Sequence, residues 1–386
     1  MTQGLDIAFF GCSLVSAYEN GAATYCRGIL RALSERGHRI RFYEPLVPER
    51  LAYRDIVDPP WADVTRYVSD GTGLEEALAD AYDADVLIKG SDIGLFDELI
   101  EAALPHCTTS TALSVYWDMS GPATLARLRE RTDDPLRLQL PWYDLVLIRS
   151  GGAATVEGFE RIGARCCFPV YNAFDPTTHH PSPPDDYYDA VLTLCAHRVP
   201  ERDEPVARMF VRAAEALPGR RFVLAGCGWD DMPLPANVRY LGYVYTGEHN
   251  ALHASTRATL NVSRPIERET GYCPSARLFE AAAAGACAIS DPWSGLEQFF
   301  DPGNDILIAN DGDEVAAHLS LLNPERAALI GRRARDRALA QHTYAHRAIE
   351  VEALHCAARF GDAGVADRQV RRQARPWHSP HLLRRG

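Results

Sequence analysis

Lysine is almost absent from the sequence, and positive charge is in the minority. Lys89 is the only lysine among 386 residues, and 40 basic residues face 52 acidic ones, for a formal net charge of -12 at pH 7. A nucleic-acid-binding protein typically presents a basic face over much of its surface. The charge balance therefore argues against nucleic acid as a partner.

The sequence also lacks long apolar runs and a leader-like start. No stretch approaches the roughly 20 apolar residues that span a bilayer, and residues 1–6 lead into an apolar segment without the features of a signal peptide. Ten cysteines are scattered without any C-x-x-C pair, which does not indicate a disulfide framework. We therefore expect a cytoplasmic protein with no transmembrane segment and with reduced, mostly buried thiols.

The composition is that of a globular protein, with 46% hydrophobic and 24% charged residues. A chain of this length exceeds what one hydrophobic core usually organises, so we expect about two domains.

Short apolar runs that end in small or polar residues recur in the first half, at residues 6–10, 85–90, 114–118 and 143–148. Such runs are typical of a buried parallel sheet. Ligands of open α/β sheets bind beyond the carboxyl ends of the strands. We therefore expect one crevice to be lined by the residues around these ends, namely Gly11, Lys89, Asp118 and Arg149 to Gly152.

A proline-rich segment at residues 168–189 predicts an exposed linker between two domains. A second series of strands follows it, at residues 191–194, 222–225, 258–262 and 286–289. We expect an α/β protein with an N-terminal Rossmann-like domain over 1–180, a C-terminal Rossmann-like domain over 181–360 and a basic tail over 361–386. Both sheets should be parallel and doubly wound.

The most specific signal is the segment from Ser275 to Asp291, in which Glu280 lies on an alanine-rich helix that ends at Gly285 before a strand. A carboxylate in this position can accept hydrogen bonds from both ribose hydroxyls, and the nearby helix N-terminus favours a diphosphate. The alternative is an ordinary helix with a surface glutamate and a glycine C-cap.

The Glu280-Ala-x-Ala-x-Gly285 pattern resembles the C-terminal signature of GT-B glycosyltransferases. The second half is also similar to their CgeB-like branch, through Arg198-Val-Pro-Glu-Arg202, Gly226-Cys-Gly-Trp229, Leu241-Gly242, residues 260–262 and 277–285, and Ser290-Asp291. The resemblance implies two domains that face each other across a cleft. It also implies transfer of a sugar from a nucleoside-diphosphate sugar, bound mainly by the second domain through Glu280, to a small-molecule or glycan acceptor held by the first. It favours retention of the anomeric configuration and no cofactor.

Two positions depart from the family pattern. Tyr272 stands where a leading glutamate is often found, which leaves Glu269 as a displaced substitute, and Cys195-Ala196-His197 replaces a small glycine loop. The second departure weakens the inference that this loop binds phosphate.

Three arginines could neutralise the leaving diphosphate. Arg198 and Arg202 follow a predicted strand, and the alternative for both is pairing with Glu201, Asp203 and Glu204. Arg277, a further donor-binding candidate, could instead form an i, i+3 pair with Glu280.

Further donor-binding candidates surround these arginines. Gly226 and Gly228 allow close approach of the backbone, and Trp229 could stack on a base or sugar or serve as a core aromatic. Tyr243 lies where GT-B enzymes contact the base.

In the first domain, Gly21 and Thr24 belong to a helix start that resembles the small-residue turn of GT-B enzymes, near Gly11, and Asn20 is expected to cap this helix. Asp118 and Arg202 are the catalytic candidates. Asp118 could act as a base towards an acceptor hydroxyl, and its alternative is a helix N-cap or turn former.

No metal site is expected. His179-His180 lacks further ligands at zinc spacing, and the Asp-x-Asp setting of metal-dependent GT-A transferases is missing. Rival functions are a non-catalytic nucleotide-sugar-binding or coat-associated protein and a GT-B epimerase. The base, the sugar, the acceptor and the oligomeric state do not follow from the sequence.

Overall fold

The computed structural model describes residues 4–18 and 20–360, which form two compact units. One unit contains the described residues up to Tyr171 and from Ala345, and the other spans Asn172–Tyr344. This division differs from the expected one in two places. The boundary lies before residue 172 rather than at 180, and residues 345–360 return to the first unit. The tail expected at 361–386 lies outside the described residues.

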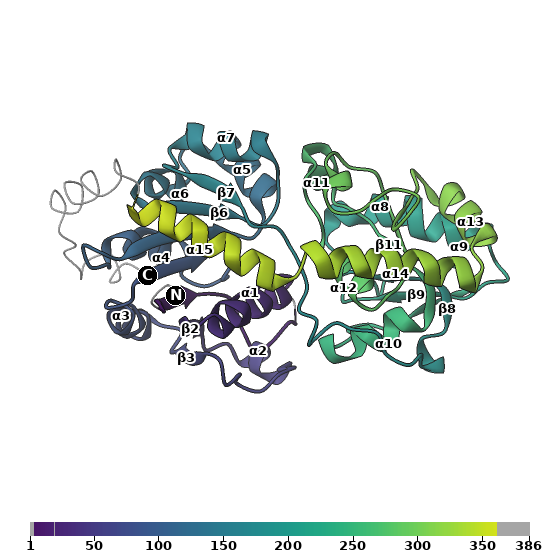
Figure 1. Ribbon diagram of the computed structural model, residues 1–386, viewed down its shortest axis with the longest axis horizontal. Coiled ribbons are helices and arrows are strands. Elements are labelled where there is room, and N and C mark those ends of the chain that lie inside the picture. Colours follow the sequence, from purple (N-terminus) through teal and green to yellow (C-terminus); the bar gives the residue numbers. More distant parts are fainter. Residues whose placement is uncertain (1–3, 19, 361–386) are drawn as a thin grey trace. The chain divides into compact units, whose positions relative to one another are not determined.

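The first unit contains a seven-stranded parallel sheet in the order β3-β2-β1-β4-β5-β6-β7 (Figure 1). The strand order reverses between β1 and β4, as expected for a doubly wound sheet. The strands are β1 (Asp6–Phe10), β2 (Arg39–Pro45), β3 (Asp63–Tyr67), β4 (Val86–Gly90), β5 (Leu113–Asp118), β6 (Leu145–Ile148) and β7 (Cys167–Pro169).

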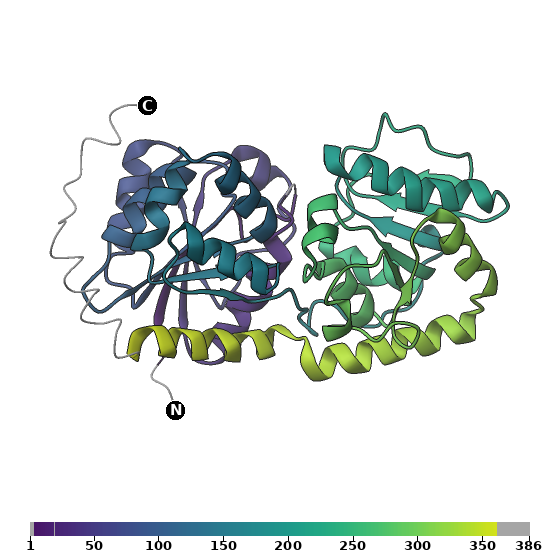
Figure 2. The same ribbon diagram turned by 90° about the horizontal axis from the view of Figure 1, so that it is seen from above.

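Helices cover both faces of this sheet (Figure 2). They are α1 (Ala23–Glu35), α2 (Pro48–Ala52), α3 (Gly71–Asp80), α4 (Asp97–Ala103), α5 (Gly121–Glu130), α6 (Pro135–Gln139), α7 (Ala153–Ile162) and α15 (Tyr344–Phe360). On α1, the helical stripe of Ile29, Leu30 and Leu33 is buried.

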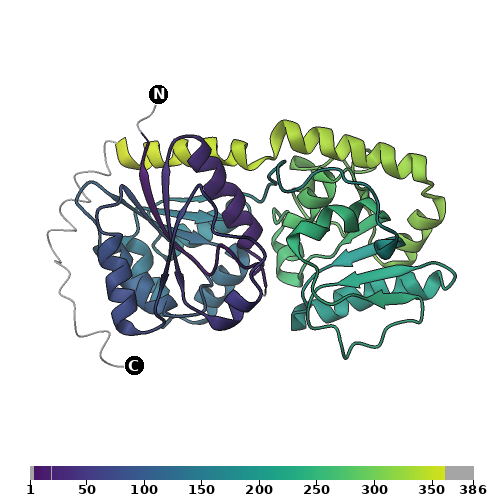
Figure 3. The same cartoon turned by 90° about the horizontal axis from the view of Figure 1, so that it is seen from below.

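The last helix, α15, drawn in yellow in Figure 3, packs on the first unit. Glu352 accepts hydrogen bonds from Arg36 at 2.6 Å and lies 2.9 Å from Nε2 of His38. Arg347 Nε donates to the Tyr171 carbonyl at 3.2 Å. These contacts explain why residues 345–360 belong to the first unit.

The second unit contains a six-stranded sheet in the order β10-β9-β8-β11-β12-β13, again parallel and doubly wound. Its strands are β8 (Ala190–Cys195), β9 (Phe222–Ala225), β10 (Val238–Tyr240), β11 (Thr256–Asn261), β12 (Ala288–Ser290) and β13 (Leu307–Ile308). The predicted strands are confirmed within about two residues.

The helices of this unit include a π-helical turn at Ala207–Val211 that joins α8 to α9. They are α8 (Asp203–Val206), α9 (Arg212–Ala216), α10 (His249–Ala254), α11 (Pro265–Thr270), α12 (Ala276–Ala283), α13 (Gly312–Leu321) and α14 (Pro324–Gln341). Gly285 has a φ of 76° after α12, as its predicted role at the helix end requires. A Cβ on Gly331 of α14 would lie 1.9 Å from the Gly285 carbonyl oxygen, so only glycine allows this close packing.

The segment predicted as an exposed linker is in part buried. Phe174 is 2% exposed and bridges to Thr343, and His179 is 3% exposed. The prediction was therefore wrong for these residues, because proline-rich composition does not reveal which side chains the rest of the second unit covers.

Fewer of the cysteines are buried than expected. All ten cysteines are free, and five of them are buried. Among the described residues, no helix combines the length and apolar character needed to cross a membrane.

Candidate functional site

The carboxyl ends of β8, β9 and β11 lie at one edge of the second sheet, because these strands are parallel neighbours. The loop after β8 contains His197, whose ring stacks on Tyr243 with centroids 6.0 Å apart. Nδ1 of His197 accepts a hydrogen bond from the Cys227 amide at 3.2 Å. Burial lowers the pKa of His197 to about 4, so the ring is neutral at pH 7. A neutral imidazole thus occupies the loop in which the family resemblance implied glycine.

The glycines after β9 bring two backbone segments together. Gly226 has a φ of 111°, and a Cβ there would lie 2.1 Å from the Ala196 carbonyl oxygen. Trp229 is fully buried in the hydrophobic core, and its indole N–H donates to the same carbonyl at 2.7 Å. The predicted stacking of Trp229 on a ligand is therefore wrong, because the core covers the ring. Gly228, with a φ of 90°, supports the same turn.

Arg198 is engaged by carboxylates of its own unit. Nε and Nη2 donate to the two oxygens of Asp203 at 2.8 Å, and Nη1 donates to Asp231 and to the Gly228 carbonyl. This is the alternative that the sequence left open for Arg198, with Asp203 as the partner. A bidentate pair of this kind leaves the guanidinium little capacity for a diphosphate.

The positive charges of Arg202 and Arg277 are less fully balanced by neighbouring carboxylates than that of Arg198. Nη1 of Arg202 donates to the His197 carbonyl at 2.9 Å, whereas its buried Nε has no hydrogen-bond partner among the described residues. Burial, and next the charge of Arg277, lower the pKa of Arg202 to about 10. Nη1 of Arg277 donates to Asn261 at 3.2 Å, and the described contacts include no ion pair with Glu280. An anion that contacts both arginines would relieve their repulsion.

Glu280 is buried on α12, with 7% of its surface exposed. Its Oε2 lies 3.5 Å from Nδ1 of His249, and its Oε1 lies 3.9 Å from Nε2 of His179. Burial disfavours ionisation, but the two imidazoles beside the carboxylate outweigh it and hold the pKa of Glu280 well below its ordinary value. Glu280, the predicted ribose-binding residue, is therefore an ionised and enclosed hydrogen-bond acceptor.

The β11 strand end and the start of α12 are joined by polar contacts. Ser275 adopts an extended conformation before α12, and its hydroxyl donates to Asn261 at 2.7 Å. Because Arg277 donates to the same Asn261 oxygen, the strand end orients both the helix start and the arginine. This arrangement places Arg277 one helical turn before Glu280.

The position of the missing leading glutamate is structurally constrained. Tyr272 has a φ of 52°, which is unusual for a residue with a side chain, and its amide donates to the Ser294 carbonyl at 2.7 Å. Glu269 is exposed on α11. Glu267 on the same helix instead pairs with Arg264 at 2.9 Å, and its pKa is lowered because this arginine outweighs burial. The structure therefore favours Glu267, which interacts with Arg264 and Arg202, over Glu269 as the substitute for the missing leading glutamate.

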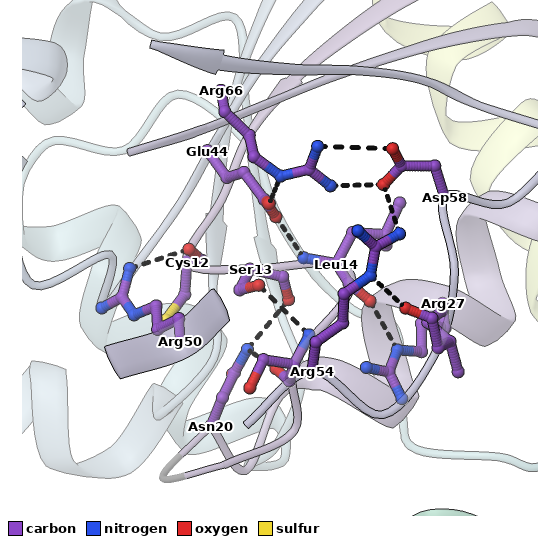
Figure 4. Close-up of polar contacts among 12 residues, drawn as sticks. Cys12, Ser13, Leu14, Asn20, Arg27, Glu44, Arg50, Arg54, Asp58 and Arg66 are labelled. Carbon is purple, nitrogen blue, oxygen red and sulfur yellow. Dashed lines mark hydrogen bonds and ion pairs between the residues drawn. The ribbon is translucent and has the colours of Figure 1, made fainter. Parts of the chain in front are cut away.

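In the first unit, the loop between β1 and α1 is held by a polar network (Figure 4). Nδ2 of Asn20 donates to the carbonyls of Ser13 at 2.9 Å and Ser16 at 3.3 Å. The N-cap of α1 is Ala22, without a side-chain cap, so the prediction that Asn20 caps this helix was wrong. Asn20 shapes the preceding loop instead.

The neighbouring loop residues take the places expected for a helix-start turn. Gly21 is exposed and Thr24 is half-buried on the first turn of α1. Nη1 of Arg149, beyond β6, donates to the Gly21 carbonyl at 3.1 Å. The Gly11 amide donates to Tyr43 at 3.0 Å, and a Cβ on Gly11 would lie 2.5 Å from the Phe42 ring. Gly11 thus serves packing against β2.

Lys89 is the penultimate residue of β4 and Asp118 the last residue of β5, and both are fully buried. Lys89 Nζ donates to Asp97 and to the Gly90 carbonyl. Asp118 accepts a hydrogen bond from the Ser120 amide at 2.8 Å, as its turn-forming alternative predicts. Burial, and next the charge of Asp92, raise the pKa of Asp118 to about 6.

The substitution Asp118→Asn distinguishes a catalytic base from a turn former. We expect kcat to stay near that of the wild type and the free energy of unfolding at pH 7 to rise by up to about 3 kcal/mol. The native carboxyl titrates near 6 and the unfolded one near 3.8, so the native state binds more protons between these values. Wild-type stability from this group therefore falls as pH rises from about 4 to about 6.

Urea unfolding of both proteins between pH 4 and pH 8 measures this difference, which should grow up to about pH 6 and then stay constant. If Asp118→Asn instead loses most of its kcat, and its free energy of unfolding depends on pH as that of the wild type does, Asp118 has the role of a base.

The fold matches solved structures over nearly its whole length. HepE of Anabaena, solved in complex with UDP-glucose, superimposes with a TM-score of 0.64 at 13% identity, covering 91% of this chain and 99% of that one. Sucrose-phosphate synthase from Thermosynechococcus elongatus gives 0.68 at 14% identity, with 91% and 98% covered. AviGT4, a glycosyltransferase involved in avilamycin A biosynthesis, gives 0.59 at 15% identity, with 92% and 98% covered. The chain thus has the GT-B fold.

The sequence match is confined to one part of the chain. Residues 201–353 match a family model described as "Glycosyl transferase-like". This segment contains Arg202, Arg277 and Glu280. No curated protein sequence matches the chain significantly.

The interpretation of the sequence missed three histidines of this unit. In the sequence, His197 stands out only as a departure from glycine, and no motif includes His249. The sequence neighbours of His179 hold no ligand set. The signal that could have identified two of them is that His197 lies in the loop after β8 and that His249 begins α10, the first α-helix after β10.

Proposed function

We propose that this protein is a glycosyltransferase that transfers a sugar from a nucleoside-diphosphate sugar to a small-molecule or glycan acceptor. The observation that carries the proposal is that two arginines with incompletely balanced charge, Arg202 and Arg277, occur in the same site as Glu280, an enclosed and ionised carboxylate on α12. Binding of a diphosphate requires the positive charges of the arginines. Binding of a ribose requires a carboxylate that accepts hydrogen bonds from its hydroxyls. Uracil is the base to test first, because HepE of Anabaena binds UDP and UDP-glucose.

Each residue has a distinct role in this proposal. Glu280 accepts hydrogen bonds from the ribose hydroxyls, and Tyr243 contacts the base. Arg202 and Arg277 neutralise the negative charge that develops on the diphosphate as the sugar leaves. The backbone N–H groups at the start of α12 add a positive dipole end. The first unit, through the loop that Asn20 shapes, holds the acceptor.

The reaction is proposed to be metal-independent and to retain the anomeric configuration. Arginines supply the positive charge that a divalent cation supplies in other transferases. Retention follows from the family resemblance of the second unit. Under retention, no base needs to activate the acceptor from the opposite face, which agrees with the buried, turn-forming Asp118.

A non-catalytic nucleotide-sugar-binding protein is the second candidate. The neutral His197 in the loop after β8 favours this candidate. Its imidazole already accepts the hydrogen bond from the Cys227 N–H, which is therefore not available to a phosphate. Incubation of the protein with UDP-glucose distinguishes the two, since a transferase is expected to hydrolyse its donor slowly without acceptor. An epimerase would instead convert the sugar without releasing it.

Thermal unfolding in the presence of UDP, GDP, TDP, ADP or CDP tests donor binding. A ligand at 100 times its Kd adds about 2.7 kcal/mol to the free energy of unfolding. We expect one diphosphate, with UDP foremost, to raise Tm clearly, and the shift to be the same with magnesium or with EDTA. If no diphosphate raises Tm, the donor-binding role of this site is refuted.

A further inference from the structure

We propose that His179, His249 and Glu280 form a binding site for a transition-metal dication, Zn²⁺ foremost, that competes with the donor for Glu280. One ligand atom from each side chain lies within 4.8 Å of the others. The competition rests on the proposed function, whereas the metal site itself does not. The metal would therefore act as an inhibitor of donor binding and not as a participant in transfer.

The three ligands come from separate segments that the fold brings together. Glu280 lies on α12, His249 is the first residue of α10, and His179 belongs to the connector before β8. Helices α10 and α12 pack against each other. Glu280 lies 3.5 Å from His249, at the long limit of a hydrogen bond, and 3.9 Å from His179, beyond that limit. A small shift of each side chain would accommodate a cation among them.

Asn250 holds the connector against α10. Its Nδ2 donates to the Thr178 carbonyl at 2.9 Å, and its Oδ1 accepts from the His180 amide at 3.1 Å. The two bonds flank His179 on either side and fix the backbone from which its ring projects. His179 is thus placed by the same helix that carries His249.

The nitrogen atoms are oriented as metal ligands require. Nε2 of His249 lies 3.4 Å from the Val244 carbonyl, which favours a proton on that nitrogen and leaves Nδ1 towards Glu280. Metal-bound histidines commonly donate their other N–H in this way. Nε2 of His179 is buried, faces Glu280 and has no hydrogen-bond partner among the described residues.

The chemistry of the ligands selects the cation. Two imidazoles and a carboxylate match the ligand set of many zinc sites, and they leave a fourth position for water. Magnesium prefers oxygen ligands in octahedral geometry and retains its waters, so it should not compete.

The test is zinc binding to the full-length protein after treatment with EDTA and its removal. Calorimetry should detect a zinc equivalent that weakens by at least roughly 10–100-fold in His179→Ala and in His249→Ala, since loss of even an outer-shell partner has this effect. Glu280→Gln, which preserves the shape of the side chain, should weaken it similarly in a folded protein. His180→Ala is the matched control, because His180 is exposed beside His179 and lies outside the cluster.

Cobalt(II) distinguishes this site from the cysteines. Binding at the cluster should give visible bands of a tetrahedral ion without the charge-transfer absorption of a thiolate ligand, and these bands should disappear in His249→Ala. Zinc binding that is unchanged in both histidine variants, or cobalt spectra dominated by thiolate absorption, would overturn the site.

Addition of UDP to the zinc-loaded protein tests the competition. We expect the apparent Kd for UDP to rise with zinc concentration and to return to its original value with EDTA. If zinc binds and UDP does not, the metal site stands and the proposed function fails. If UDP binds and zinc does not, the reverse holds, and independent binding of both overturns the overlap at Glu280.

Discussion

Arg202→Ala is expected to lower kcat for sugar transfer by roughly 10²–10³-fold, the loss typical of removing one preorganised donor that stabilises developing charge. The guanidinium is half-buried beside Arg277, and its Nε has no partner among the described residues. Its charge is therefore available to a departing diphosphate in a site that water screens poorly. Steady-state kinetics with the donor identified by thermal unfolding give kcat and KM separately.

Arg198→Ala provides the matched control for this experiment. Arg198 follows the same strand, but Asp203 and Asp231 neutralise it. We expect kcat to fall far less than in Arg202→Ala. Equal losses in the two variants would show that the loop acts through its conformation. A larger loss in Arg198→Ala would mean that its ion pairs open to receive the donor.

Glu280→Ala is expected to weaken donor binding by roughly 1.5–3 kcal/mol, or about 10–150-fold in Kd, the usual contribution of hydrogen bonds to a charged group. Removal of the carboxylate also leaves the buried imidazole of His179 and the half-buried imidazole of His249 without their anionic neighbour. Titration calorimetry with the diphosphate, in EDTA, measures the change without interference from zinc.

Two further variants make this result specific. Glu280→Gln keeps the volume and one acceptor oxygen, so its Kd should fall between those of the wild type and Glu280→Ala. Glu269→Ala removes an exposed carboxylate from neighbouring α11 and should leave the Kd unchanged. An unaltered Kd in Glu280→Ala, with the fold intact, would refute the ribose role.

The sequence predicted backbone elements more fully than side-chain environments. Apolar runs predicted most strands of both sheets, because central strands of a parallel sheet are buried on both faces. The edge strands β3, β7 and β13 were not predicted. For β7 and β13 the reason is length, since two or three residues carry too little periodicity. Glycine at position 285 predicted the end of α12 correctly, because the required left-handed conformation is a local property.

The site residues were harder to predict because their partners lie far along the chain. Arg198 and Arg202 are four residues apart and look equivalent in sequence, yet only Arg198 is paired on both sides, through Asp203 and Asp231. Trp229 looked suited to stacking on a ligand, but the core around β8 and β9 covers its ring. No local pattern specifies these environments.

The sequence by itself determined the two Rossmann-like sheets, the helix that carries Glu280 and its glycine end, because these depend on periodicity and local backbone conformation. Only the tertiary structure decided that α15 returns to the first unit, that Arg202 is left under-compensated and that His179 and His249 lie against Glu280. Those features depend on contacts across tens to hundreds of residues, where burial and charge are set by which side chains the fold brings together.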